Sequence, residues 1–315
     1  MKLFRNYVQA AIFIGCALLA VDEGMAQSDN NGKLEILLPV TALDEKKGVS
    51  FEPTKEKIKV FLGKSEQTIT SIVSAETPSK IVFLVDYSGS MREAFSDPTK
   101  VKAAFMQFFQ SSNSANEYAL IAFNQDAALI KDWTTKPQNI IDGFDSLTSQ
   151  KPQGVTALYN GLAKGMNYLN ARATGKRALI LITDGKDKNS QVNRQEIVAK
   201  SNELQIPLYF AVLDNLDDRA AGVFGGRSAR TDGTNWVGKD TGGEVFFVNK
   251  PADFEKALMK IGDLIRQQFI IKFIPNIGND DKRVNITIKF FSSTNPSKEI
   301  DNLKILYPQY YVAKK

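Results

Sequence analysis

The sequence predicts an α/β domain with a doubly wound, mostly parallel sheet, inserted into a small, sandwich-like β domain. Three observations indicate this fold class. Apolar runs such as Ile81–Val85 are typical of strands that are buried on both faces of a parallel sheet. Segments with helical periodicity alternate with these runs between Lys80 and Gln268. Strand-like segments without helices lie on both sides of that stretch, so the simplest packing joins the N-terminal and C-terminal strands in one β domain.

The N-terminal β segment, residues 27–78, has three strand-like stretches. They are Leu34–Leu43, Ile58–Leu62 and Thr68–Val73. The last of them alternates apolar and polar residues, as a half-buried antiparallel strand does. The C-terminal β segment, residues 269–315, has three more. They are Phe269–Ile274, Val284–Phe291 and Leu303–Tyr311.

The α/β domain is expected at residues 79–268. Further buried strands are predicted at Tyr118–Phe123, Ala178–Ile182, Leu208–Leu213 and Val245–Val248. Helices are predicted from Asp97 to Phe109 and at Thr156–Leu169, Gln191–Leu204 and Ala252–Gln267. Asp97 followed by Pro98 is typical of a helix start, with a capping residue and then proline at the first helical position.

Composition excludes several classes of function. The 315 residues are 43% hydrophobic and 24% charged, as in ordinary globular proteins. The chain has no histidine, which excludes Ser-His-Asp and Cys-His catalysis and histidine-ligated zinc. Its single cysteine, Cys16, excludes an intramolecular disulfide. The net charge of +5 comes without a block of basic residues, so nucleic-acid binding is not indicated.

The first 26 residues are typical of a secretory signal peptide. A basic start precedes an apolar stretch from Val8 to Val21, and small residues end at Ala26. Because this stretch is short for a membrane span, we expect cleavage after Ala26 and export to the periplasm, the cell surface or the medium. An uncleaved anchor and a lipoprotein attached through Cys16 are the alternatives. After removal of the signal, no apolar run is long enough to span a bilayer.

Two carboxylates follow buried strands of the predicted sheet. Asp86 comes directly after Ile81–Val85, and Asp184 closely follows Ala178–Ile182. Ligands of open α/β sheets bind at the carboxyl ends of the strands. We therefore expect both aspartates to face one common edge of the sheet.

Three hydroxyls accompany these carboxylates. Ser88 and Ser90 lie in the tight loop that Asp86 opens, and Thr156 lies at the start of a predicted helix. Oxygen ligands suit a hard cation such as Mg²⁺, Mn²⁺ or Ca²⁺. Two carboxylates and three neutral hydroxyls leave such an ion undersatisfied, so an external acidic group can complete its shell.

The set Asp86, Ser88, Ser90, Thr156 and Asp184 resembles the metal-ion-dependent adhesion site of von Willebrand factor A domains. The surrounding words DYSGSM, GVTALYNGL and LILITDGKD are similar to that family in order and spacing, and all five ligand positions are present. The resemblance covers about Ser79 to Gln268. It implies a Rossmann-like A domain that holds a divalent cation, with Mg²⁺ favoured over Mn²⁺ and Ca²⁺. It further implies direct ligation by the three hydroxyls, carboxylates that often act through water, and a partner protein that supplies an acidic side chain.

Other residues near this site have two possible roles. Tyr87, Met91 and Arg92 border the loop and either contact a ligand or support the loop. Asp187 either belongs to the outer shell of the site or faces solvent, and the second is favoured. The Gly- and Arg-rich stretch Asp214–Asp240 lies where the family usually has a short connection. It is either a partner-contact loop or a tolerated insertion.

The sequence therefore predicts an exported bacterial protein that binds a partner through its cation, in adhesion or envelope assembly, and is not an enzyme. The flanking strands resemble those of a subgroup of bacterial exported proteins with A domains. One alternative is a scaffold subunit of an envelope complex with a purely structural metal. A metal-dependent hydrolase is the other, although no general base is evident. No G-x-S-x-G elbow and no phosphate-binding P-loop occur. The sequence does not indicate an oligomeric state.

Overall fold

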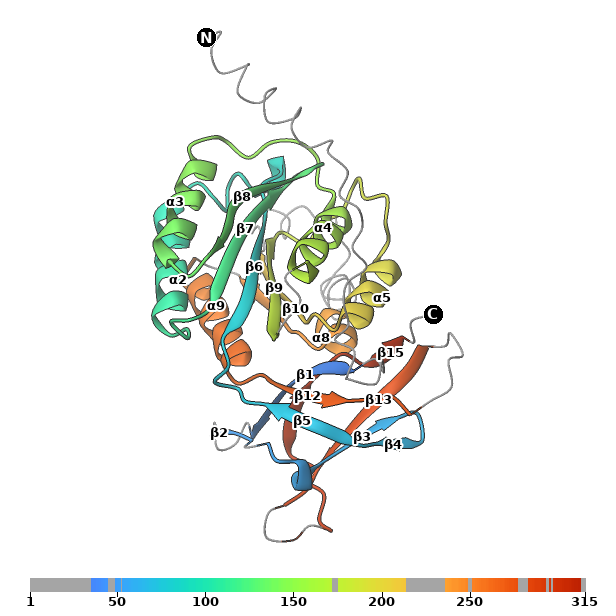
Figure 1. Cartoon of the computed structure of the whole chain (residues 1–315). Coiled ribbons are helices and arrows are strands. Elements are labelled where there is room, and N and C mark those ends of the chain that lie inside the picture. Colours follow the sequence, from blue (N-terminus) through green and yellow to red (C-terminus); the bar gives the residue numbers. More distant parts are fainter. Residues whose placement is uncertain are drawn as a thin grey trace.

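The computed structural model describes most of the chain as an α/β domain and a β domain (Figure 1). The described residues are 35–44, 49–51, 53–171, 175–213, 236–248, 251–276, 283–292, 295 and 297–312. The predicted signal peptide and Cys16 lie outside them, as does most of Asp214–Asp240. Among these residues, no helix combines the length and the apolar character that crossing a membrane requires.

The α/β domain is built on a six-stranded sheet in the order β11-β10-β9-β6-β7-β8. Its strands are β6 (Ser79–Asp86), β7 (Glu117–Phe123), β8 (Ala127–Thr134), β9 (Lys176–Thr183), β10 (Leu208–Leu213) and β11 (Val245–Val248). Neighbouring strands are parallel except β7 and β8, which are antiparallel. The chain winds outward from β6 in both directions, which confirms the predicted doubly wound, mostly parallel sheet.

Helices cover both faces of this sheet. One face carries α2 (Pro98–Gln110), α3 (Pro137–Thr148) and α9 (Pro251–Arg266). The other carries α4 (Leu158–Asn170), α5 (Arg194–Leu204) and α8 (Trp236–Thr241). Along β6, Phe83 and Val85 pack under the first group and Leu84 packs under the second, all with 0% exposure. Burial of such side chains contributes about 1.5–3 kcal/mol each. Because both faces of β6 are buried, apolar residues are favoured at successive positions, and the strand is a continuous apolar run.

The β domain consists of two antiparallel sheets. The first contains β1 (Ile36–Asp44), β2 (Val49–Ser50), β5 (Ile69–Val73), β12 (Phe269–Phe273) and β14 (Leu303–Leu306). The second contains β3 (Ile58–Leu62), β4 (Ser65–Gln67), β13 (Arg283–Phe290) and β15 (Tyr310–Val312). N-terminal strands pair with C-terminal ones, β1 with β12 and β14, and β3 with β13. The α/β domain therefore interrupts a single β domain, as the sequence predicts.

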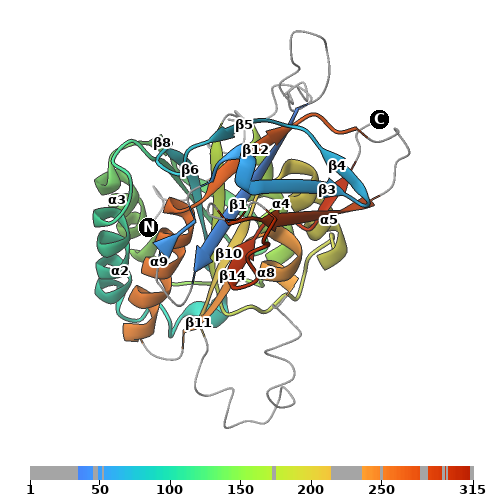
Figure 2. The same cartoon turned by 90° about the horizontal axis from the view of Figure 1, so that it is seen from below.

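The two sheets of the β domain share one apolar core. Leu38 and Val40 of β1 and Val60 of β3 are fully buried, and they belong to the same cluster as Ile286 of β13. Seen from below in Figure 2, the strands of this domain cross the end of the α/β domain, with α2, α3 and α9 on one side and α4, α5 and α8 on the other. The carboxyl ends of the parallel strands lie at the opposite end of the sheet (Figure 1).

Several elements differ from the sequence prediction. The edge strand β8 and the helix α3 were not predicted. No residue of β8 is fully buried, and its apolar run, Ala127–Ile130, is short and is followed by charged residues. Short strands β2 and β4 are also additional. The predicted final strand is divided into β14 and β15, with Pro308 between them, because proline has no N–H to donate to a ladder.

Helix starts follow local capping chemistry. The predicted cap of α2 is confirmed, since the Asp97 side chain accepts from the Thr99 N–H and Pro98 begins the helix. The helix expected from Gln191 begins later, at Arg194, because Asn193 and Glu196 form a capping box there. Similarly, α4 begins at Leu158 rather than at Thr156. Thr156 is thereby left in the loop before the helix.

Candidate metal centre

Asp86 is the last residue of β6 and is fully buried. Its Oδ1 accepts from the Ser88 N–H at 3.0 Å, and its Oδ2 accepts from the Thr183 hydroxyl at 2.7 Å. The pKa of Asp86 is raised from its ordinary range to about 6, because burial outweighs the hydrogen bonds from Thr183 and Ser88, which lower it, and the charge of Asp184 adds a smaller rise. The carboxylate is thus held in one orientation at the edge of the sheet.

The three predicted hydroxyls lie together at this edge. Thr156 Oγ1 donates to Ser88 Oγ at 2.8 Å, and Ser88 Oγ lies 3.2 Å from Ser90 Oγ. Ser88 and Thr156 are buried, whereas Ser90, in the short 3₁₀ helix Gly89–Met91, is partly exposed. The structure therefore brings together residues that lie up to 68 positions apart in the sequence.

Two loops hold Thr156 in place. Gly154 has φ +84°, a conformation that favours glycine, and its carbonyl accepts from the Gly89 N–H at 3.0 Å. The Thr156 carbonyl accepts from the N–H groups of Lys188 and Asn189 at 3.0 and 3.1 Å. These bonds join the Thr156 loop to the loop of Ser88 and to the one that carries Asp184.

Asp184 follows β9, and its side chain is only 3% exposed. Its Oδ1 accepts from the Lys186 N–H at 3.2 Å. Its Oδ2 is buried and lacks a hydrogen-bond donor among the described residues, although Lys186 Nζ lies 3.4 Å away as an ion-pair partner. A buried carboxylate oxygen without a donor is costly, so this atom is suited to a positively charged ligand.

The donor set fits a hard divalent cation. Carboxylate and hydroxyl oxygens from Asp86, Ser88, Ser90, Thr156 and Asp184 gather at one edge of the sheet, the kind of ligand that Mg²⁺, Mn²⁺ and Ca²⁺ accept. Within the described ranges no group of three or more His, Cys, Asp or Glu side chains is placed to hold a metal. A metal centre here depends on hydroxyls, and its fit is supported by Asp184 Oδ2, a buried oxygen without a hydrogen-bond donor among the described residues.

Tyr87 and Met91 support the loop. The Tyr87 hydroxyl donates to the Gln150 carbonyl at 2.6 Å, and its ring packs 5.6 Å from the ring of Phe95. Met91 has 0% exposure within the core under α2. Of the two roles that the sequence leaves open for these residues, burial favours support of the loop over contact with a partner.

Arg92 and Asp187 are exposed but bonded. Arg92 Nε donates to the Pro152 carbonyl at 2.9 Å, and so it connects its loop to the one before Thr156. Asp187 Oδ1 accepts from the Leu158 N–H at 2.8 Å and from the Ser190 hydroxyl at 2.5 Å. Asp187 therefore caps the start of α4 as well as facing solvent.

Two residues outside the predicted ligand set also build the site. Thr183 holds Asp86 Oδ2, and Asn124, which follows β7, accepts the Ala157 N–H with its carbonyl at 2.8 Å. The Asn124 side chain donates to the Gln153 carbonyl at 3.0 Å. Both are polar residues at the carboxyl end of a strand, and that position was the available signal.

The family comparison agrees with this geometry. Residues 81–186 match the family model described as the von Willebrand factor type A domain. The chain contains a von Willebrand factor type A domain. The matched part of this A domain runs from β6 into the loop after β9, so it includes all five candidate metal ligands.

The inter-alpha-trypsin inhibitor heavy chain H3 of Pongo abelii is a curated relative. It is 26% identical over 145 residues, which cover 42% of this chain and 16% of that protein. The match thus spans only about a sixth of the relative's length.

Solved structures also resemble the chain. A von Willebrand factor type A protein from Catenulispora acidiphila has a TM-score of 0.49 and 11% identity, over 83% of this chain and 75% of that one. The conserved hypothetical protein BatB from Bacteroides thetaiotaomicron has a TM-score of 0.46 and 18% identity, over 59% and 98%. The pilus adhesin SpaC from Lactobacillus rhamnosus GG has a TM-score of 0.48 and 12% identity, over 80% and 47%.

Proposed function

We propose that this chain is an exported binding protein whose A domain holds a divalent cation and captures an acidic side chain of a partner protein, in adhesion or envelope assembly. The cation is held by Asp86, Ser88, Ser90, Thr156 and Asp184. When bound there, it supplies a coordination position that an acidic oxygen of the partner can fill.

The observation that supports this proposal is the joint placement of three hydroxyls and two buried carboxylates at the carboxyl edge of the sheet. Ser88, Thr156 and Asp86 are 0–3% exposed, and Asp184 Oδ2 has no hydrogen-bond donor among the described residues. An A domain with this donor set suits binding through a cation, because its oxygen ligands leave a position for an acidic group of a partner.

The chain's own residues have separable tasks. Asp86 orders the loop by accepting the Ser88 N–H, and Thr183 fixes the orientation of its carboxylate. Ser90 lies at the partly exposed side, where a partner approaches. Val155, next to Thr156, is 44% exposed and offers an apolar contact beside the charged site.

Calorimetric titration of the purified protein with Mg²⁺, Mn²⁺ and Ca²⁺ tests the proposal. We expect saturable binding that is lost in Ser88→Ala/Ser90→Ala and retained in Ser146→Ala/Ser149→Ala, a control pair of exposed serines on and just after α3. An acidic peptide added with the metal is expected to raise the affinity for the metal, because it supplies the missing ligand.

Two results would contradict the proposal. One is the absence of metal binding with and without the acidic peptide. The other is equal metal binding by the wild type and Ser88→Ala/Ser90→Ala, which would place the metal elsewhere.

A further inference from the structure

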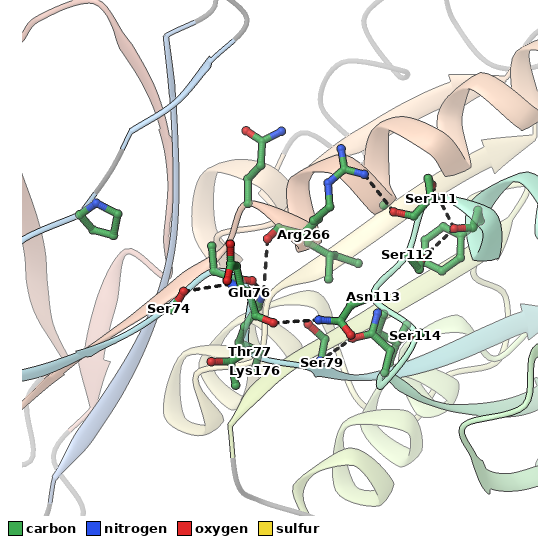
Figure 3. Close-up of a pocket in the computed structure, with 18 of the residues that line it drawn as sticks. Ser74, Glu76, Thr77, Ser79, Ser111, Ser112, Asn113, Ser114, Lys176 and Arg266 are labelled. Carbon is green, nitrogen blue, oxygen red and sulfur yellow. Dashed lines mark hydrogen bonds between the residues drawn. The ribbon is translucent and has the colours of Figure 1, made fainter.

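A second site is indicated at the end of the α/β domain opposite to the metal centre. A cavity of about 980 Å³ lies at the junction with the β domain, between the ends of α2 and α9 and the chain that links β5 to β6 (Figure 3). Its volume is in the range of small-molecule sites. Ser79 and Lys176, which begin β6 and β9, line it, whereas Asp86 and Asp184 lie at the other ends of these strands.

Lys176 is the unusual member of this lining because it is only 1% exposed. Its Nζ donates to the Ala75 carbonyl at 2.5 Å and to the Arg266 carbonyl at 3.4 Å. An ammonium has three N–H donors, so two backbone acceptors leave one donor over. Within the part of the chain that the structure describes, no carboxylate forms an ion pair with Lys176, and a buried charge without a counter-ion is costly.

Ser79 provides a second donor beside it. Ser79 and Lys176 are register partners on neighbouring parallel strands, so their side chains leave the sheet on the same face. Ser79 is 3% exposed, and its hydroxyl has no hydrogen-bond partner among the described residues. Ser79 and Lys176, each with a donor to spare, thus lie on neighbouring strands in the wall of one cavity.

We propose that this cavity binds a small molecule through an oxyanion, a carboxylate or a phosphate group, with the Lys176 ammonium and the Ser79 hydroxyl as donors. The oxyanion would supply the counter-charge that Lys176 lacks among the described residues. This site is separate from the metal centre and does not depend on the function proposed for it.

Two charged side chains at the rim of the cavity, Glu76 and Arg266, should affect the binding of an anion. Glu76 lines the cavity but is exposed and makes no ion pair with Lys176, so it does not neutralise the ammonium. Arg266 is bonded to the Ser111 carbonyl at 2.9 Å and to Asp263 at 2.7 Å, which places its guanidinium across the gap between α9 and α2. We therefore expect Glu76 to oppose an anion at long range and Arg266 to favour one.

The titration of Lys176 is consistent with this geometry. Burial lowers the pKa of Lys176 from its ordinary value to about 8. A bound anion would favour the charged form and raise this pKa again.

The test uses inorganic phosphate and citrate as probes, titrated into the full chain by calorimetry with melting temperature as a second readout. We expect at least one of them to bind the wild type. Lys176→Met and Ser79→Ala should weaken that binding, Lys176→Met by about tenfold or more, the effect of losing a charge-assisted hydrogen bond. Lys80→Met is the matched control, because Lys80 is next to Ser79 but pairs with Glu117 at 3.2 Å and does not line the cavity.

A second variant keeps the proposal testable if Lys176→Met does not fold. Ser79→Asp places a carboxylate beside Lys176, so it should abolish anion binding while raising the melting temperature. Binding of phosphate alone or of citrate alone supports the proposal and identifies the type of oxyanion. Failure of both probes to bind, or equal binding by wild type, Ser79→Ala and Ser79→Asp, would overturn it.

Discussion

At the scale of single residues, the two carboxylates of the metal centre differ in how their oxygens are satisfied. Both oxygens of Asp86 accept hydrogen bonds, from the Ser88 N–H and the Thr183 hydroxyl. Asp184 Oδ2 is buried without such a donor among the described residues. Asp86 is therefore the residue that organises the loop, whereas Asp184 Oδ2 has, within the described part of the chain, only the ion pair with Lys186 Nζ at 3.4 Å.

Replacement of Thr183 tests the organising role of Asp86. Thr183→Val removes the hydroxyl that fixes Asp86 Oδ2 and leaves all five candidate ligands present. Loss of such an outer contact typically lowers metal affinity by about 10–100-fold, which calorimetry with Mn²⁺ can measure. The control is Thr148→Val, whose hydroxyl bonds the Phe144 carbonyl at the end of α3. An unchanged affinity in Thr183→Val would show that the orientation of Asp86 does not depend on Thr183.

Asp187 is expected to act on stability and not on the metal. Asp187→Ala removes the acceptor of the Leu158 N–H at the start of α4, and loss of a helix cap costs about 0.5–2 kcal/mol. Urea unfolding should show this loss, with Asp301→Ala, an exposed aspartate, as a neutral control. If Asp187→Ala abolished metal binding with unchanged stability, Asp187 would belong to the metal centre.

At the scale of elements, α4 is positioned by glycines that allow it to approach the sheet. A Cβ at Gly165 would lie 2.8 Å from Leu179 of β9, and one at Gly161 would lie 2.8 Å from Phe123 of β7. This close packing fixes the start of α4 and hence the loop that carries Thr156.

Gly165→Ala should therefore destabilise the protein although alanine favours helices. The gain of about 1 kcal/mol in helix propensity is outweighed by overpacking, which typically costs about 1–3 kcal/mol. Chemical unfolding measures the difference, and Lys164→Ala on the exposed side of α4 serves as the control. A more stable Gly165→Ala variant would mean that α4 can move away from the sheet at no cost.

At the scale of the whole molecule, the chain passes between the two domains at two places, and Lys176 touches both. Its Nζ bonds Ala75, in the link from β5 to β6, and Arg266, at the end of α9 before β12. This arrangement holds the α/β domain against the β domain into which it is inserted.

The buried ammonium should make stability depend on pH. Because burial lowers the pKa of Lys176 to about 8, the unfolded chain binds more protons than the folded one between that pH and the ordinary lysine pKa near 10.5. Stability attributable to Lys176 should thus rise across this window, by up to about 3 kcal/mol. The measurement is the difference in unfolding free energy between wild type and Lys176→Met from pH 7 to 10.5, which cancels the titration of tyrosines common to both. A difference that stays constant with pH would contradict the lowered pKa.

The parts of the fold that could be predicted from the sequence are the fully buried strands and the strand-rich segments on either side of the α/β domain. Buried strands such as β6 and β10 read as apolar runs because both faces are covered, and strand pairing between the chain ends followed from the flanking segments. The partly exposed β8 lacked such a pattern. At the site, residue types and spacing indicated the five candidate ligands, but the support from Thr183 and Asn124 depends on contacts between distant loops. Lys176 could not be selected, since a lysine in a sequence is normally a surface residue.

The most direct test of the proposed metal centre is a crystal structure of the protein grown with Mn²⁺, with anomalous diffraction used to locate the ion. We expect one strong anomalous peak at the carboxyl edge of the sheet, within bonding distance of Ser88, Ser90 and Thr156 and close to Asp86 and Asp184. An anomalous peak elsewhere with none at this edge, or no peak in a crystal saturated with Mn²⁺, would contradict it.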